Sequence, residues 1–273
     1  MLLDARGHRL FYSRYPLESF AARKNPFELT IGDNLFSLRQ LRLDIADGPA
    51  KVKAELEFRG LHPWPVRLFS PGVMGWYAFV PRMECYHGVL SLTHRIDGYI
   101  RVGGDRVDMD GGKGYTEKDW GRSMPSSWIW MQTNHFDEAD ASLTGSIAKI
   151  PWLGHSFTGF IFGLYLRGRL YPFTTYSGAK ISKIDVSDSR LAIVMEDRRY
   201  RLEIAADRAE GVTLPAPSLG EMSARVNESL RSRIQADLYR KSAPGADWIF
   251  SGAGRNAGLE ITGDLAELLR GLK

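Results

Sequence analysis

The sequence contains one cysteine, Cys85, and no apolar run of about 18 residues, the length that a membrane-spanning helix needs. A single cysteine excludes an internal disulfide and a cysteine-rich zinc site, and it agrees with a reducing compartment. The opening MLLDARGHRL is interrupted by Asp4, unlike a secretory signal. These absences predict a cytoplasmic protein with no transmembrane segment.

The sequence also has no long run of residues with the same charge. The net charge of +4 comes from lysines and arginines spread along the chain, and the densest basic cluster is Arg198, Arg199 and Arg201. A nucleic-acid partner is therefore not expected. The six histidines lack the paired spacing of metal ligands, so the sequence predicts no metal site and no other cofactor.

Alternation of apolar and polar residues is the dominant pattern. Residues 52–58 alternate strictly, as do residues 41–45, and such a period of two is typical of half-buried strands. Similar runs recur at residues 89–93, 127–135, 143–150, 157–166, 191–196, 200–205 and 234–239. Glycine-containing turns such as Asp97-Gly98 separate many of them. The pattern predicts an all-β fold of antiparallel barrels or sandwiches.

Two segments depart from this alternation. Ser218 and Glu221 have the spacing of a capping box, and Met222, Val226 and Leu230 follow at helical intervals, which predicts a short helix over residues 218–231. A tail helix over residues 264–270 is also expected.

A chain of 273 residues suits one large domain or two modest domains. The Met124-Pro125-Ser126 turn is the expected seam between a domain of residues 1–123 and a domain of residues 124–273.

The segment 114–136, GYTEKDWGRSMPSSWIWMQTNHF, combines side chains that folding alone rarely demands. In a strand, Glu117 and Asp119 point to one face, while Lys118 and Trp120 point to the other. The run that follows places four further side chains on one face: Trp128, Trp130, Gln132 and Asn134. Because buried indole and amide groups need partners, this stripe fits a cavity wall.

Two interpretations of these residues stay open. The acids and Lys118 can instead form an ion-paired strand crossing, with the tryptophans filling a barrel, since structural ion pairs also shift pKa values. The apolar segment 71–80, PGVMGWYAFV, is interpreted as a core strand with a glycine kink, in preference to a lip that contacts lipid.

The motifs EKDWG at 117–121 and WIWMQ at 128–132 resemble the tocopherol cyclase family, whose hallmark is E-K-x-W-G followed by W-x-W-x-Q. The resemblance covers nearly the whole chain and is strongest over residues 83–178. It implies two lipocalin-like antiparallel β-domains around an apolar pocket, as in carotenoid hydratases and some cycloaddition enzymes. Family members usually begin with F-E-G-W-Y-F, and nothing similar precedes residues 9–15, so an incomplete first domain is expected.

The resemblance also implies a chemistry. Tocopherol cyclases are isomerases of the intramolecular lyase type, which add a phenol oxygen across a prenyl double bond after protonating it. Asp119 is the first candidate for the proton donor and Glu117 the second, since burial and a like-charged neighbour raise the pKa of a carboxyl.

The remaining candidates would bind substrate. Trp120, Trp128 and Trp130 would stabilise a carbocation, and Gln132 and Asn134 would hold the phenol or quinol head. Lys118 would pair with Glu84 or contact a head-group oxygen, and His87 completes the candidate set.

The expected partner is a hydrophobic small molecule, a prenylated aromatic or related isoprenoid, with transient membrane contact left open. The alternatives are a non-catalytic carrier with an apolar pocket but no acid, and a hydratase or cycloaddition enzyme on the same scaffold.

Overall fold

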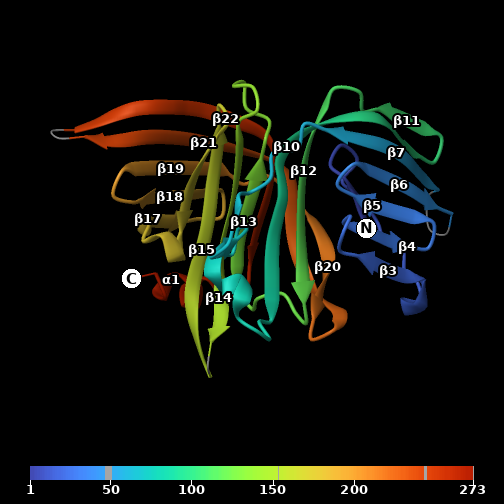
Figure 1. Ribbon diagram of the computed structural model, residues 1–273, viewed down its shortest axis with the longest axis horizontal. Helices are drawn as coiled ribbons and strands as arrows, with labels where there is room; N and C mark the ends of the chain where they lie inside the picture. The colour runs from blue at the N-terminus through green and yellow to red at the C-terminus, as the bar shows by residue number, and fades with distance from the viewer. Residues whose placement is uncertain (47–50, 153, 243–244, 273) are drawn as a thin grey trace.

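The computed structural model describes residues 1–46, 51–152, 154–242 and 245–272 (Figure 1). Two large antiparallel sheets contain most of these residues, which confirms the all-β prediction. Neither sheet closes on itself in the strand order of the described residues. No helix in these ranges is long and apolar enough to cross a membrane.

The first sheet has eight strands in the order β11-β10-β7-β6-β5-β4-β3, with β12 paired to β10. Its strands are β3 (Phe20–Arg23), β4 (Glu28–Ile31), β5 (Asn34–Ser37), β6 (Gln40–Ile45), β7 (Val52–Arg59), β10 (Cys85–Val102), β11 (Asp105–Asp108) and β12 (Gly112–Gly121). Two short pairs lie outside it: β1 (Leu2–Asp4) with β2 (Arg9–Phe11), and β8 (Val66–Arg67) with β9 (Ser70–Pro71).

The second sheet has ten strands in the order β16-β15-β14-β13-β22-β21-β19-β18-β17, with β20 paired to β21. Its strands are β13 (Trp128–Thr133), β14 (Ser142–Trp152), β15 (His155–Leu166), β16 (Arg169–Thr174), β17 (Lys180–Val186), β18 (Arg190–Glu196), β19 (Tyr200–Asp207), β20 (Val212–Ser218), β21 (Glu221–Ser242) and β22 (Gly245–Thr262). The largest core cluster belongs to this sheet, and Ile129 and Met131 of β13 are fully buried in it.

The two sheets meet where β10 and β12 lie against β13 and β14, in the centre of Figure 1. Ser142 Oγ donates to the Leu92 carbonyl at 2.6 Å, and Asn134 Nδ2 donates to the Gly114 carbonyl at 2.8 Å. A smaller apolar cluster joins Val89 and Leu92 of β10 to Tyr165 of β15. These contacts hold one face of the first sheet against one face of the second.

The predicted helix over residues 218–231 is wrong. β20 ends at Ser218, and β21 runs as a strand from Glu221. Met222, Val226 and Leu230 are four residues apart, and residues at that interval share a face in a strand as well as in a helix. Ser218 and Glu221 pair across a hairpin turn, with Leu219 and Gly220 at positive φ, instead of forming a capping box.

The tail helix is confirmed as α1 (Leu265–Arg270), where the Asp264 side chain accepts from the Glu267 N–H. The core strand expected over residues 71–80 is not formed. β9 ends at Pro71 and a 3₁₀ turn, η2 (Gly75–Phe79), follows. Met74 is buried, whereas Trp76 and Phe79 are exposed.

The strands of the first sheet end at Gly121 and those of the second begin at Trp128. The division into two lipocalin-like domains at residue 123 remains a prediction.

Candidate functional site

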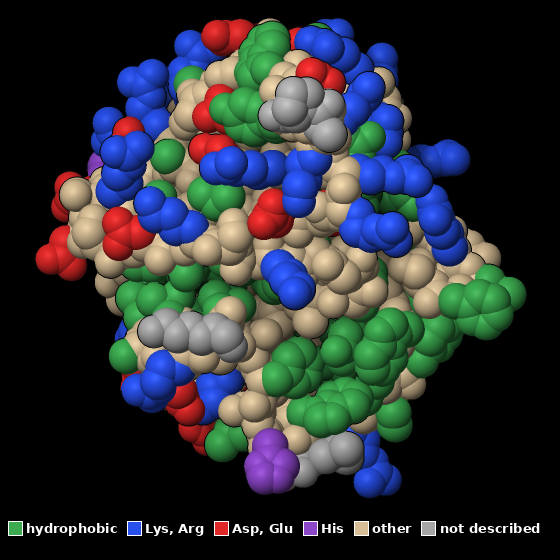
Figure 2. Space-filling model, turned by 90° about the vertical axis from the view of Figure 1, so that its left-hand side faces the viewer, with side chains coloured by type: hydrophobic (Ala, Val, Ile, Leu, Met, Phe, Trp, Pro, Cys, Tyr) green, Lys and Arg blue, Asp and Glu red, His purple; other side chains and the backbone are tan. Residues whose placement is uncertain are grey.

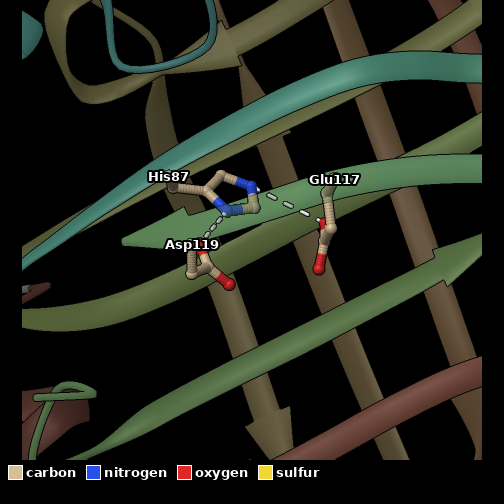
Figure 3. Close-up of side chains that lie close together, drawn as sticks. All are labelled: His87, Glu117 and Asp119. Atoms are coloured by element: carbon tan, nitrogen blue, oxygen red, sulfur yellow. Dashed lines mark hydrogen bonds and ion pairs between the residues drawn. The ribbon is translucent and has the colours of Figure 1, made fainter. Parts of the chain in front are cut away.

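Strand register brings three ionisable side chains together on β10 and β12. His87 lies directly opposite Asp119, and Val89 lies opposite Glu117. His87 Nδ1 is 2.7 Å from Asp119 Oδ1, and His87 Nε2 is 3.8 Å from Glu117 Oε2 (Figure 3). The alternation of β12 therefore places both acids on one face, as the sequence predicts, and β10 contributes the imidazole between them.

Glu117 is held by two donors that share one oxygen. The Tyr115 hydroxyl donates to Oε2 at 2.5 Å, and Trp130 Nε1 donates to the same atom at 3.3 Å. Among the described residues no donor reaches Oε1, which points away from His87 in Figure 3. Burial raises the pKa of Glu117 and the Asp119 charge adds to this, while His87 and the two donors act in the opposite direction.

The pKa of the His87 imidazole is raised above its usual value. Burial by itself would lower the pKa of His87, but the hydrogen bond to Asp119 and the charges of Glu117 and Asp119 outweigh it, so the pKa is raised. Asp119 is 31% exposed at its side chain, against 22% for Glu117 and 19% for His87. The more exposed of the two acids is therefore the hydrogen-bond partner of the histidine.

The opposite wall of the site comes from the second sheet. Trp130 of β13 lies directly opposite Glu260 of β22, and Glu260 lies directly opposite Glu228 of β21. Trp128 Nε1 donates to Glu260 Oε2 at 2.6 Å. Burial is the main cause that raises the pKa of Glu228 and of Glu260 to about 7, with neighbouring carboxylates contributing.

A cavity of about 140 Å³ lies between the two walls. Its lining includes one histidine and three acids, His87, Glu117, Asp119 and Glu260, and Trp128 and Trp130 form part of its aromatic lining. Met124 and Pro125, from the segment between the sheets, also line it. The site is thus a space between the sheets with acids on both sides.

A second cavity, of about 60 Å³, adjoins the first and is lined mainly by apolar and aromatic side chains, including Tyr77, Phe157 and Tyr176. Five residues line both cavities: Met74, Ser146, Ala148, Ile150 and Ile161. Tyr77 stacks on Trp76 and on Phe157, and Trp152 packs edge-on against this group. Figure 2 shows hydrophobic side chains gathered on the surface where η2 meets the β14–β15 hairpin. The acidic cavity therefore continues toward an aromatic surface.

A family model described as tocopherol cyclase-like matches residues 42–263 of the chain. The chain belongs to the tocopherol cyclase-like family. It is 26% identical to the chloroplastic tocopherol cyclase of Zea mays over 219 residues, which cover 77% of this chain and 46% of the maize protein. It is 27% identical to a probable chloroplastic tocopherol cyclase of Oryza sativa subsp. japonica over 172 residues, 60% of this chain and 36% of the rice protein. The matches thus span less than half the length of these relatives.

Five predicted site residues of this tocopherol cyclase-like chain meet at the cavity: His87, Glu117, Asp119, Trp128 and Trp130. Lys118 and Trp120 lie on the other face of β12, where Lys118 Nζ is 4.4 Å from the centre of the Trp120 ring. Trp120 also stacks on Tyr86 and is 46% exposed. This pairing replaces the expected contact between Lys118 and Glu84.

The two amides and Glu84 also lie outside the cavity lining. Asn134 bonds to the Gly114 carbonyl and so joins the sheets. Gln132 Nε2 is buried without a hydrogen-bond partner in the described part of the chain. Glu84 uses its backbone carbonyl to accept from the N–H groups of Arg122 and Ser123.

Sequence reasoning missed three functional candidates: Tyr115, Glu228 and Glu260. Tyr115 lies two residues before Glu117 and therefore points to the same face of β12, which the sequence alone indicates. Glu260 is flanked by Leu259 and Ile261, and a charged residue within an apolar strand is a usable signal too. Glu228 gives no such signal, because the sequence predicts a helix over residues 218–231 and the segment is a strand.

Ligand atoms of His87, Glu117 and Asp119 all lie within 4.8 Å of one another, so this set has the chemistry to hold a divalent cation. One of the two ring nitrogens of His87, Nδ1, is already hydrogen-bonded to Asp119. The absence of a metal in this family member remains a prediction.

Proposed function

We propose that this chain binds a prenylated phenol or quinol and cyclises it by protonating the prenyl double bond. The observation that carries this proposal is a half-buried carboxyl, Glu117, which shares one cavity with the indoles of Trp128 and Trp130. An acid-initiated cyclisation needs a protonated acid, groups that stabilise a cation, and exclusion of water. The family and the names of the maize and rice relatives support this reaction class.

Glu117 is the proton donor in this proposal, in preference to Asp119. Asp119 is already engaged by its 2.7 Å hydrogen bond to His87, and the pKa of His87 is raised. Glu117 is more buried, and its pKa is raised. Because Tyr115 and Trp130 both donate to Oε2, the proton of the neutral acid resides on Oε1.

The bond changes are simple. The Glu117 proton adds to the less substituted alkene carbon and leaves a tertiary cation on the other carbon. The phenol oxygen then forms a C–O bond to the cation and loses its hydrogen. The π faces of Trp128 and Trp130 stabilise the cation before ring closure, and the product has the mass of the substrate.

The two cavities divide the substrate between them. The acidic cavity suits the aromatic head and the reacting double bond, and the adjoining apolar cavity suits the start of the prenyl tail. Sites for drug-sized ligands typically measure about 300–1,000 Å³, more than these two cavities together enclose. A long tail would therefore continue over the exposed aromatic residues of η2, where transient contact with a membrane would also take place.

The test is incubation of the purified chain with prenylated quinols of several tail lengths, followed by mass spectrometry. Cyclisation gives a product of unchanged mass and altered retention, whereas hydration adds one water. Binding without any conversion would overturn the enzyme proposal and favour a carrier. The sole cysteine, Cys85, agrees with a reducing, cytoplasmic location, which stays part of the proposal.

Glu117→Gln should lower kcat by about two orders of magnitude or more with little change in ligand affinity, as expected for loss of a general acid. Asp119→Asn should lower kcat less, because it removes the partner of His87 and leaves the acid. Glu57→Gln is the matched control, since Glu57 is 68% exposed and pairs with Arg59 on β7. Unchanged turnover in Glu117→Gln would contradict the assignment of the acid.

A further inference from the structure

We infer that Glu260 is the base that accepts the phenol proton during ring closure, with Glu228 as the neighbouring carboxyl that sets its basicity. The inference rests on the proposed cyclisation. It adds a second catalytic group, on the opposite sheet from the acid. The cyclising oxygen loses its hydrogen as the C–O bond forms or directly afterwards, and a carboxylate beside it can accept that proton.

The geometry separates the two roles. Glu117 enters the cavity from β12 of the first sheet, and Glu260 enters it from β22 of the second. A substrate lying between the sheets would therefore present its double bond to one carboxyl and its hydroxyl to the other. Both groups line the same cavity, so no intervening side chain has to relay the proton.

Glu260 is oriented for this task by Trp128. The indole Nε1 donates to Oε2 at 2.6 Å, and among the described residues no donor reaches Oε1. One oxygen is thus anchored, and the other is free to accept from a ligand hydroxyl. The same pattern, one oxygen held and one free, occurs at Glu117.

Glu228 lies directly opposite Glu260 in the register of β21 and β22. Two carboxyls on neighbouring strands repel when both are ionised, which favours protonation of one of them. Burial is the main cause that raises the pKa of both groups to about 7, and the charge of Glu228 contributes to the shift of Glu260. At neutral pH the pair can therefore take up a proton and release it again.

The proton balance closes over one turnover. Glu117 gives one proton to the alkene carbon, and Glu260 takes one from the phenol oxygen. The protein ends with its total charge unchanged, and the two carboxyls have exchanged protonation states. Solvent that enters as the product leaves restores the starting state.

The experiment separates alkene protonation from ring closure. Wild-type protein and variants are incubated in D₂O with a prenylated quinol and with its methyl ether, in which the cyclising hydroxyl is blocked. Protonation of the alkene is measured by deuterium on the prenyl side chain, in products whose double bond has moved or has added water. Ring closure is measured by formation of the cyclic ether. The methyl ether can show only the first of these.

Glu260→Gln keeps the shape of the side chain and an oxygen for Trp128, but removes the base. It should retain deuterium incorporation within about threefold of wild type and lose cyclisation by about 100-fold, the usual size of a general-base effect. Glu117→Gln should lose both, which distinguishes failure of the proposed function from failure of this inference. Glu57→Gln is again the control.

Cyclisation by Glu260→Gln at the wild-type rate would overturn the inference. Loss of deuterium incorporation together with cyclisation would overturn it too, because Glu260 would then serve the acid step or the structure. A second readout does not depend on turnover: the infrared band of protonated carboxyl groups should contain two components that titrate near neutral pH, one from Glu228 and one from Glu260. Glu260→Gln should lose one of them and keep the other.

Glu228→Gln tests the neighbour. Removing the Glu228 charge should lower the pKa of Glu260, because that charge contributes to raising it. The rising limb of kcat/KM against pH should therefore move to lower pH. If the rising limb of the Glu228→Gln profile stays at the wild-type pH, the role assigned to Glu228 is overturned.

Discussion

His87 and Asp119 lie directly opposite each other on β10 and β12, and His87 Nδ1 is 2.7 Å from Asp119 Oδ1. With the proton on Nδ1 donated to this carboxylate, Nε2 is left facing Glu117. One pair across two strands thus fixes the position of the imidazole and the charge beside the proposed acid.

Asp119→Asn should lower the pKa of His87, because the hydrogen bond and the charge of Asp119 both raise it. Titration of the imidazole by NMR measures this directly. Asp137→Asn is the matched control, since Asp137 is 90% exposed and pairs with Arg255 away from the cavity. A His87 pKa unchanged by Asp119→Asn would contradict the described pair.

The same pair makes a pH-dependent contribution to stability. A histidine whose pKa is higher in the folded state stabilises the fold below its unfolded pKa, about 6.5, and this contribution is lost as pH rises through the folded pKa. The difference in unfolding free energy between wild type and Asp119→Asn should therefore be larger at about pH 5.5 than at about pH 9. Urea denaturation at the two pH values measures it, and a difference that grows with pH would contradict the sign.

Tyr115→Phe should raise the pKa of Glu117, because the tyrosine hydrogen bond acts to lower it. The falling limb of kcat/KM against pH should move to higher pH. Tyr115 also contacts Thr144 Oγ1 at 2.9 Å, so a loss of stability of about 1–3 kcal/mol should accompany the change. Tyr99→Phe serves as control, because Tyr99 packs under Arg106 at the edge of the first sheet. A limb that moves to lower pH in Tyr115→Phe would contradict the described donor.

Ala148→Leu should discriminate between substrates by tail length. Ala148 lines both cavities, and three added carbon atoms would narrow the passage from the acidic cavity to the aromatic one. Affinity for long-tailed prenylquinols should fall by about tenfold or more, equivalent to about 1.4 kcal/mol, and that for short-tailed ones should change little. Ala253→Leu, at an exposed position of β22, is the control. Equal loss for all tail lengths would contradict the division of the substrate between the cavities.

Gly258→Ala should disturb the tryptophan wall. A Cβ at this position would lie 2.7 Å from the ring of Trp130, so the indole that donates to Glu117 would have to shift. We expect a loss of about 1–3 kcal/mol of stability together with reduced turnover. Gly104→Ala meets nothing within 4 Å and should stay within about 0.5 kcal/mol of wild type. Equal behaviour of the two variants in urea denaturation would contradict the close packing of Trp130.

The sequence by itself determined the all-β class and, for the strictly alternating strands, the content of each face. A pleated strand repeats every two residues, so alternation in β7, β12 and β13 was enough to predict which side chains point together. Glu117 and Asp119 share a face for this reason. The motifs around them indicated the family, which the match over residues 42–263 confirms.

The sequence alone leaves other features undecided. The interval of four residues in Met222, Val226 and Leu230 suits a helix and a strand equally, and only the partners of β21 decide between them. Local spacing also cannot tell which of two strand faces a second sheet will cover. Trp120 and Lys118 therefore were candidates by sequence and lie outside the cavity.

Only the tertiary structure decided which residues confront one another across the site. Glu117 and Glu260 are far apart in the chain and share a cavity because one sheet packs against the other. The packing of the sheets also raises the pKa of both carboxyls, because burial excludes water and disfavours the charged form. Strand periodicity fixed the composition of each wall, and the packing of the sheets created the space between the walls.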